Sequence, residues 1–180
     1  MRGIGEKILC LTGLLFLFLI ANAQSWTLKD TGAGLIINTE DNNKPLKIMR
    51  RGSTWDVKEL HKNGAMEGKY NGNQLFAAWI MGPETKEFLN SKGKPAWMYK
   101  YKITYPDGVI FESDPKEFCS KGYSYFGIKT GDYTEGVWKI EWFIINREKQ
   151  QSSQVATTVF QTTWGNPGKK DHFEIKSEQP

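Results

Sequence analysis

Apolar and polar residues alternate along residues 97–105, and this alternation is the clearest structural signal in the chain. The odd positions are aromatic or Ile, and the even positions are mostly polar. Because successive side chains of a strand point to opposite faces, the pattern predicts a strand with one buried face. Pro106-Asp107-Gly108 follows and favours a turn, since proline presets φ and glycine accepts a positive φ. Residues 109–112 are therefore expected to return as the second strand of a hairpin.

A second hairpin is predicted in the last third of the chain. Residues 137–146 are apolar at nearly every position, with Lys139 and Glu141 as the main interruptions. A strand that is apolar on both faces is typical of a central position in a sheet, with its second face covered by a loop or a partner. Residues 155–163 are rich in β-branched side chains and are expected to pair back onto this strand.

The remaining elements are shorter and are separated by segments rich in Gly, Asn, Asp and Pro. Residues 54–62 are predicted to form one or two helical turns with Thr54 as the N-cap. No apolar period of 3.6 residues is sustained after residue 23, so the fold class is all-β. Short strands with turns between them predict a single antiparallel β-sandwich, with a small β-barrel as the alternative. Further strands are expected at 34–38, 46–50, 74–81 and 123–130.

The N-terminal segment has the pattern of an export signal. The positively charged residues Arg2 and Lys7 precede an apolar run over residues 8–20. Ala21-Asn22-Ala23 then supplies the small residues that a signal peptidase prefers. The run is too short for a membrane-spanning helix, which needs about 20 residues. We therefore expect a signal peptide over residues 1–23, cleavage near Ala23, and a secreted or periplasmic protein that does not span the membrane.

The rest of the chain has the length of one domain. We expect a β-sandwich domain over residues 24–164 and a polar, disordered tail over residues 165–180. The chain carries 24 basic and 20 acidic residues, intermixed along its length, for a net charge of +4. A charge this small and this mixed is not typical of nucleic-acid binding, so no nucleic-acid partner is predicted.

A single cysteine, Cys119, is expected to remain after cleavage, because Cys10 lies within the signal. The fold is therefore predicted to rest on its hydrophobic core and not on disulfides. Two interpretations of Cys119 stay open. It is either a small buried side chain or a site of pairing between chains.

The second hairpin also carries a resemblance to a known superfamily. Gly131-Asp132-Tyr133 leads into a strand that contains Trp138, and the segment 156–160 follows. This arrangement resembles the closing hairpin of bacterial secreted immunoglobulin-like domains. The resemblance implies an immunoglobulin-like β-sandwich and no particular activity. Tyr133 is interpreted as a corner tyrosine that bonds to the backbone. The chain departs from antibody-type domains, because it lacks their paired inter-sheet cysteines.

Residue types suited to metal binding or catalysis are sparse. His61 and His172 are the two histidines, and neither has a second ligand at zinc spacing, so no metal site and no cofactor are predicted. The run from Glu40 to Asn43 lacks the spacing of a helix–loop–helix calcium site and is interpreted as a solvated turn. Cys119 with His61 is a possible nucleophile–base pair, but a structural cysteine is favoured. No catalytic residue is assigned.

The function that these observations favour is non-catalytic binding. Trp97, Tyr99, Tyr101 and Tyr105 share one strand face and are the candidate binding residues, although such a face is also typical of a core. The predicted function is an exported β-sandwich protein that binds another protein or a cell-envelope component, with strand addition at a sheet edge as the mechanism. The partner and the oligomeric state stay open.

Two alternative functions are weighed against this prediction. The first is a secreted hydrolase that uses two carboxylates, for which Glu112, Asp114 and Glu141 are available. The second is a lipocalin-like carrier of a small apolar ligand. Lipocalins resemble one another through a Gly-x-Trp early in the mature chain, whereas here Gly136-Val137-Trp138 lies near the end.

Overall fold

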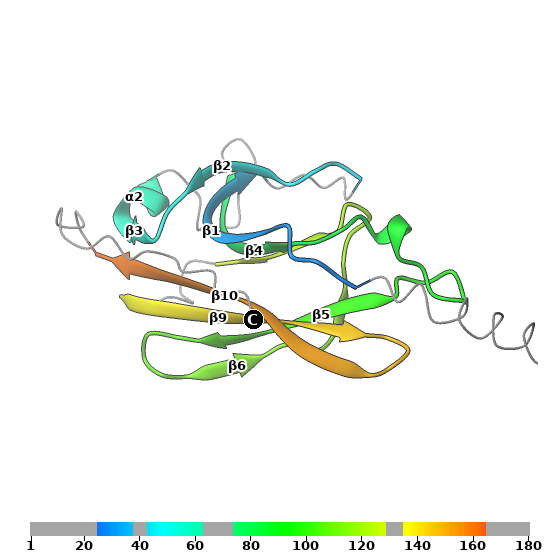
Figure 1. Cartoon of the computed structure of the whole chain (residues 1–180). Coiled ribbons are helices and arrows are strands. Elements are labelled where there is room, and N and C mark those ends of the chain that lie inside the picture. The colour runs from blue at the N-terminus through cyan, green and yellow to red at the C-terminus, as the bar shows by residue number, and fades with distance from the viewer. Residues whose placement is uncertain (1–24, 38–42, 63–73, 129–134, 165–180) are drawn as a thin grey trace, which may run out of the picture.

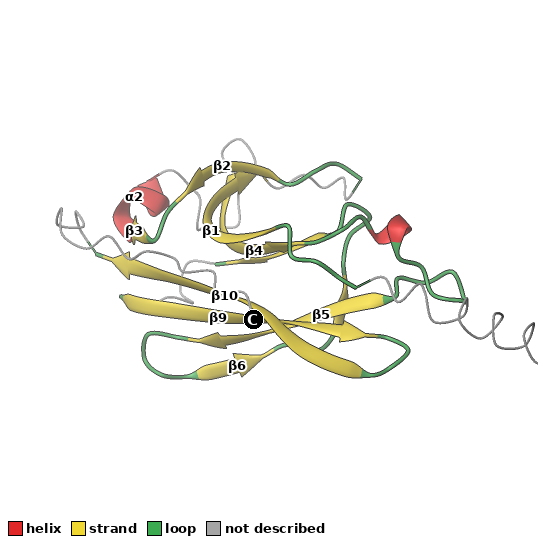
Figure 2. Cartoon of the chain, viewed as in Figure 1, coloured by secondary structure: helices red, strands yellow, loops and turns green. Residues whose placement is uncertain are grey.

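Two β-sheets lie face to face in the computed structural model, which describes residues 25–37, 43–62, 74–128 and 135–164 (Figure 1). Within these described ranges almost all of the regular structure is strand, and the helices are two short ones (Figure 2). The helices are α2 (Val57–Lys62) and the 3-10 turn η2 (Thr85–Glu87). The strands are β1 (Asp30–Ile37), β2 (Lys47–Arg51), β3 (Thr54–Asp56), β4 (Gln74–Met81), β5 (Trp97–Thr104), β6 (Ile110–Glu112), β7 (Lys116–Glu117), β8 (Tyr123–Gly127), β9 (Gly136–Asn146) and β10 (Gln151–Thr163).

The strand order defines a first sheet and a second sheet. The first sheet runs β2-β1-β4-β8, and the second runs β3-β10-β9-β5-β6, with β7 also paired to β5. The paired strands are antiparallel except for β3, which lies parallel to the end of β10. The prediction of an all-β fold is thus confirmed as two mostly antiparallel sheets. The barrel alternative is wrong, because neither sheet closes on itself.

The hairpin expected after residue 97 is confirmed. β5 buries Tyr99, Tyr101 and Ile103, while the residues between them face outward. In the turn, Gly108 has a φ of 85° and its N–H donates to the carbonyl of Tyr105 at 2.9 Å. β6 then pairs back onto β5 over three residues. The alternation of apolar and polar residues predicts this strand correctly, because one face of β5 is buried and the other is exposed to solvent.

The second hairpin is also confirmed, and β9 takes the predicted central position between β10 and β5. The expectation that a loop or a partner covers the outer face of β9 stays a prediction. Among the described residues, charged side chains of the same sheet lie on this face. The Lys100 ammonium lies 5.4 Å from the Phe143 ring centroid, and Glu141 pairs with Lys102 and Lys139. Long basic side chains cover apolar surface with their stems while their charges stay in water.

The first half of the chain differs from the sequence prediction mainly in its boundaries. β4 has the predicted bounds, whereas β1 begins at Asp30, because its first residues pair with the end of β4. Thr54 is not a helix cap. It belongs to β3, and the carboxylate of Asp56 accepts a hydrogen bond from the backbone N–H of Lys58 at 2.9 Å. Asp56 therefore caps α2.

Several predictions concern segments outside the described residues. These are the signal peptide over 1–23, the acidic turn at Glu40 to Asn42, Tyr133, and the tail over 165–180 with His172. They stay predictions. The strand expected over 123–130 is described as β8, which ends at Gly127.

Aromatic side chains from the second sheet fill the space between the two sheets. Trp138 and Trp142 are fully buried, and Trp138 stacks on Phe160 with ring centroids 5.7 Å apart. Phe160 in turn meets Phe76 of the first sheet edge-on at 5.6 Å. Burial of several aromatic rings supplies most of the stabilising free energy in a core of this kind.

A chain of four polar groups crosses this core from one sheet to the other. The indole N–H of Trp142 donates to the hydroxyl of Thr158 at 3.1 Å, and the two hydroxyls of Thr158 and Thr31 lie 2.9 Å apart. Thr31 donates to the carbonyl of Trp79 at 2.9 Å. Since the Thr31 proton is used for that carbonyl, Thr158 must donate to Thr31. Each buried donor in the chain therefore has an acceptor.

The outer face of the first sheet is also apolar and carries a second cluster. Its centre is Trp79, which is fully buried and donates its indole N–H to Asp30 at 3.1 Å. Arg51 forms two hydrogen bonds to the same carboxylate, at 2.8 and 2.6 Å, and its guanidinium lies 5.3 Å from the Trp79 ring centroid. β4 is thus buried on both faces, which explains its uninterrupted apolar sequence.

Replacement of Trp138 by alanine is expected to lower the free energy of unfolding by about 3–5 kcal/mol, because it leaves a large cavity beside Phe160. Urea unfolding measures the change. Val137→Ala is the matched control. Val137 is the preceding residue on the same strand but is 47% exposed, so its truncation should change stability by about 0.5 kcal/mol or less. Equal effects of the two variants would contradict the assignment of Trp138 to the core.

Thr158→Val is expected to lower the free energy of unfolding by about 1–3 kcal/mol, because it leaves the Trp142 N–H without an acceptor at nearly constant volume. Thr157→Val is the control, since the Thr157 hydroxyl only meets the exposed Gln154 amide. Thermal unfolding of both variants compares them. A Thr158 variant as stable as the control would show that the buried chain of hydrogen bonds contributes nothing.

Candidate functional site

An open cavity of about 200 Å³ lies at one end of the sandwich, and we call it the end cavity. Three of its residues lie side by side on neighbouring strands of the second sheet, because Asn146 pairs with Trp97 on one side and with Gln151 on the other. The next row inward contains Ile144 and Ser153. These residues belong to the inner face of the sheet. The end cavity therefore lies where the inner face of the second sheet extends beyond the side chains of the core.

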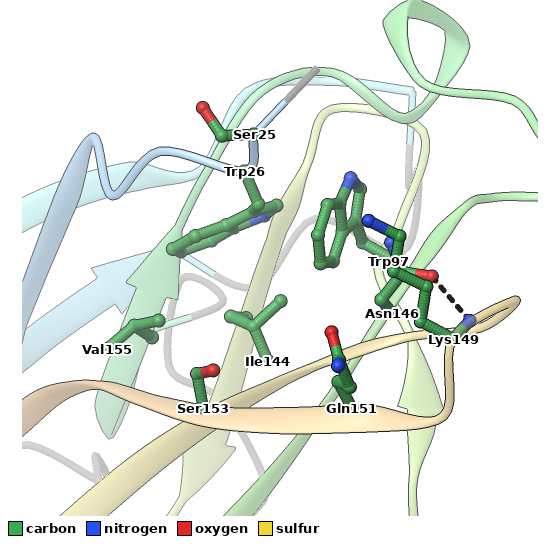
Figure 3. Close-up of a pocket in the computed structure, with 9 residues that line it drawn as sticks. All are labelled: Ser25, Trp26, Trp97, Ile144, Asn146, Lys149, Gln151, Ser153 and Val155. Carbon is green, nitrogen blue, oxygen red and sulfur yellow. Dashed lines mark hydrogen bonds between the residues drawn. The ribbon is translucent and has the colours of Figure 1, made fainter. Parts of the chain in front are cut away.

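Trp26 covers this end from the side of the first sheet. Its ring stacks on Phe118 with centroids 5.9 Å apart and an interplanar angle of 23°. A Cβ on Gly82 would collide with the Trp26 ring, so the missing side chain at the end of β4 makes room for the indole. Figure 3 shows the rings of Trp26 and Trp97 close to each other, with Ile144 pointing toward the space between them.

Polar side chains line the remaining border of the end cavity. The side-chain oxygen of Asn146 accepts from the backbone N–H groups of residues 148 and 149 at 3.0 and 2.9 Å, which leaves its amide nitrogen as a donor. The Gln151 amide and the Ser25 and Ser153 hydroxyls make no side-chain hydrogen bond to other described residues. The end cavity thus combines an aromatic wall and an aliphatic floor with several uncommitted polar groups.

The four candidate binding residues of β5 have different surroundings. Tyr99 and Tyr101 are buried in the core, 7% and 6% exposed, and burial raises the pKa of both phenols. Tyr105 is partly buried and meets the Trp138 ring edge-on at 5.1 Å. Trp97 is the member of this set that lines the end cavity. The structure therefore buries the two central tyrosines in the core between the sheets.

Sequence reasoning missed Trp26, Asn146 and Gln151. Trp26 precedes the first strand and belongs to no periodic pattern, so only its fold contacts reveal it. Asn146 and Gln151 flank the loop of the second hairpin, where polar residues are typical of any turn. The feature that could have revealed Asn146 and Gln151 is the register of the β9–β10 hairpin. The residues next to the turn of this hairpin must lie beside the start of β5.

A second surface of interest is the edge strand β6. Three consecutive residues are large, apolar and exposed: Val109 at 57%, Ile110 at 59% and Phe111 at 45%. Natural proteins usually protect an edge strand with charges, proline or a covering segment. Here the acidic residues Asp107 and Asp114 flank the apolar segment without covering it. We call residues 109–112 the β6 edge.

The main chain of the β6 edge has groups that point away from the sheet. The carbonyl of Val109 accepts a hydrogen bond from the N–H of Tyr105, the residue after β5, at 2.9 Å. The N–H of Ser113 donates to the carbonyl of Tyr101 of β5, also at 2.9 Å. Because the residues of an antiparallel strand alternate between bonded and non-bonded pairs, Phe111 also faces β5. The N–H and C=O groups of Ile110 and Glu112 then face outward. They are in position to accept a further strand.

The carboxylates considered for hydrolysis do not meet across a cleft. Glu112 pairs with Lys100 at 2.6 Å, and Glu141 with Lys139 at 3.1 Å, on the outer face of the second sheet. The hydrogen bond from Lys100 holds the pKa of Glu112 below its usual range. Asp114 is exposed in the turn after β6. Of the described residues that line the end cavity, none is an aspartate or glutamate.

The described residues contain no cluster of three His, Cys, Asp or Glu side chains that could hold a metal ion. They also contain no helix with the length and apolar character needed to cross a membrane. Cys119 is a free thiol, partly buried beside the outer cluster of the first sheet. His61 falls within α2, and its side chain is outside the description.

The chain matches no protein-family model, no curated protein and no solved structure.

Substitution of Lys100 by methionine is expected to raise the pKa of Glu112, because it removes both the hydrogen bond and the nearby positive charge. Carboxyl-carbon NMR titration measures this. Lys102→Met is the control and should produce a smaller rise, since Lys102 acts on Glu112 only through its charge. In the native protein the stabilising effect of the Lys100–Glu112 pair is present above the unfolded pKa and is lost as the pH falls through the lowered, folded pKa. An unchanged Glu112 pKa in the Lys100 variant would contradict the pairing.

Proposed function

We propose that this chain is an exported, non-catalytic, immunoglobulin-like domain that binds a partner protein by strand addition at the β6 edge. The observation that carries the proposal is the run of exposed apolar residues from Val109 to Phe111 on an edge strand. An extended partner segment would bond to the outward main-chain groups of Ile110 and Glu112. Its side chains would cover Ile110 on the outer face and Phe111 on the inner face.

Strand order supports the immunoglobulin-like assignment. When β2 and β3 are set aside and β6 and β7 are counted as one, seven strands remain. Numbered along the chain, they neighbour one another as 1-2-5 in the first sheet and 4-3-6-7 in the second. Immunoglobulin domains keep their first, second and fifth strands in one sheet and their third, sixth and seventh in the other, and variable-type domains add a strand beside the third. In this scheme, β6 takes the place of that added edge strand.

Charge indicates the chemistry of the partner. From residue 107 to residue 114 the chain carries three acidic and no basic residues, and of the three only Glu112 forms an ion pair among the described residues, with Lys100. Asp107 and Asp114 therefore supply the negative charge of this edge. A partner strand that alternates apolar and basic side chains fits this edge. A second copy of the chain fits poorly, because antiparallel pairing centred on Phe111 would bring the two acidic segments together.

The alternatives receive less support from the geometry. The candidate acids of a hydrolase are paired with lysines on a sheet face, where no substrate would be enclosed. A lipocalin-like carrier needs a closed barrel around its ligand, and the two sheets stay open. Export stays part of the proposal on the strength of residues 1–23.

The proposal predicts that the exported chain captures a protein partner from membranes or culture fluid of its source organism in a stoichiometric complex. In that complex the amides of Ile110 and Glu112 should gain protection from hydrogen exchange. Ile110→Pro should abolish binding, because it removes an outward N–H without breaking a bond to β5. Mass spectrometry identifies the partner, and amide exchange locates the contact.

Val137→Lys is the matched control for a second variant, Ile110→Lys. Both positions are exposed, 47% and 59%, but Val137 lies on the central strand β9. We expect loss of the complex for Ile110→Lys and full binding for Val137→Lys, with unchanged melting temperatures for both. A partner that leaves the two amides exchanging freely, or the absence of any stoichiometric partner, would refute strand addition at this edge.

A further inference from the structure

We propose that the end cavity is a carbohydrate-binding site that accepts one pyranose ring against the indoles of Trp97 and Trp26. This site does not depend on the β6 edge. Trp97 begins β5, whereas β6 pairs with the last three residues of that strand. The two surfaces therefore lie at opposite ends of β5 and can be tested separately.

The size of the end cavity favours a single ring. Its volume of about 200 Å³ is below the ~300–1,000 Å³ that is usual for sites that enclose drug-sized ligands. The cavity is also open to solvent at the end of the sandwich, where the wall residues come from the segment before β1, from β5, β9 and β10, and from Lys149 in the turn between β9 and β10 (Figure 3). A terminal sugar of a longer glycan could thus enter while the rest of the glycan stays outside.

The aromatic wall matches one face of a pyranose. The face of an indole ring carries partial negative charge, and the C–H bonds on one side of a sugar ring carry partial positive charge. The pairing of β5 with β9 fixes the backbone of Trp97, and the stack on Phe118 holds the Trp26 ring. The Trp26 ring is therefore in place before a ligand arrives, which reduces the conformational entropy lost on binding. Ile144 and Val155 complete the apolar part of the surface.

The polar border matches the hydroxyls of the same ring. A sugar hydroxyl both donates and accepts, and so does a side-chain amide, which can engage two neighbouring hydroxyls. The Asn146 amide nitrogen and the whole Gln151 amide are uncommitted among the described residues, as is the Ser153 hydroxyl. A wholly apolar ligand would leave these groups unpaired when it displaced their water. The combination therefore favours a ligand with a C–H face and a hydroxyl edge.

The test is an NMR titration of the exported chain, expressed from the full sequence, with the tryptophan indoles labelled with ¹⁵N. The probes are methyl β-D-glucopyranoside, methyl β-D-galactopyranoside, methyl β-D-glucuronide and N-acetylglucosamine, with their β-linked oligomers, and toluene as an apolar comparison. We expect at least one sugar to shift the indole signals of Trp26 and Trp97. The fully buried Trp79, Trp138 and Trp142 should not shift.

Variants separate the binding role of these residues from their structural role. Trp97→Ala should weaken binding of the responding sugar by about tenfold or more, the effect of losing one stacked ring. The double variant Gln151→Ala/Ser153→Ala should weaken it several-fold with no change in melting temperature, since both side chains are exposed. Trp164→Ala is the control, because Trp164 is 52% exposed but does not line the end cavity.

Three results would overturn the proposal. In the first, toluene shifts the indole signals of Trp26 and Trp97 and none of the sugars does. In the second, no probe shifts these signals. In the third, the native protein and the Gln151/Ser153 double variant bind the sugar with equal affinity. None of them bears on the β6 edge, whose partner is detected by amide exchange at Ile110 and Glu112.

Discussion

The chain of hydrogen bonds from Trp142 through Thr158 and Thr31 to the carbonyl of Trp79 is the constraint on which the other features depend. A buried indole N–H needs an acceptor, and here the acceptor is a threonine whose own proton must go to the opposite sheet. The two sheets therefore have one relative position in which all of these groups are satisfied. A slide of either sheet by one residue would break the chain and separate the aromatic rings that pack around it.

The end cavity follows from the same constraint combined with strand length. β9 has 11 residues and β10 has 13, whereas β1 and β4 of the first sheet have eight each. The core fixes the position of one sheet on the other, and the strands of the second sheet are longer. Part of the inner face of the second sheet is therefore left uncovered. Trp26 covers that face only in part, because it enters from a separate segment and packs on Phe118. What remains is an apolar surface with an open side, next to the polar residues of a hairpin end.

The sequence allowed the fold class, the two hairpins and the central place of β9 to be predicted, because each follows from a local pattern. Alternation in β5 and the Pro-Asp-Gly turn are properties of a few consecutive residues. The cap of α2 was misassigned because Thr54 and Asp56 are both good cap residues, and only the pairing of β3 with β10, some hundred residues away, decides between them. The face of β5 that contains Tyr99 and Tyr101 is ambiguous in the sequence for a similar reason. An aromatic face has the same pattern whether a second sheet or solvent lies opposite.

The hydrogen bond between Thr31 and Thr158 joins residues 127 positions apart, and this separation has a consequence for biosynthesis. A ribosome delivers the chain from its N-terminus, so Thr31 and Trp79 emerge long before their partners on β9 and β10. Until residue 158 has been made, the hydrogen bonds that join the two sheets and the contact of Phe160 with Phe76 cannot form, and such partial domains do not fold stably. Residue 158 lies on β10, the last strand of the described residues. The domain therefore stays without a complete core until this strand has been made, and it gains its tertiary structure in one late step.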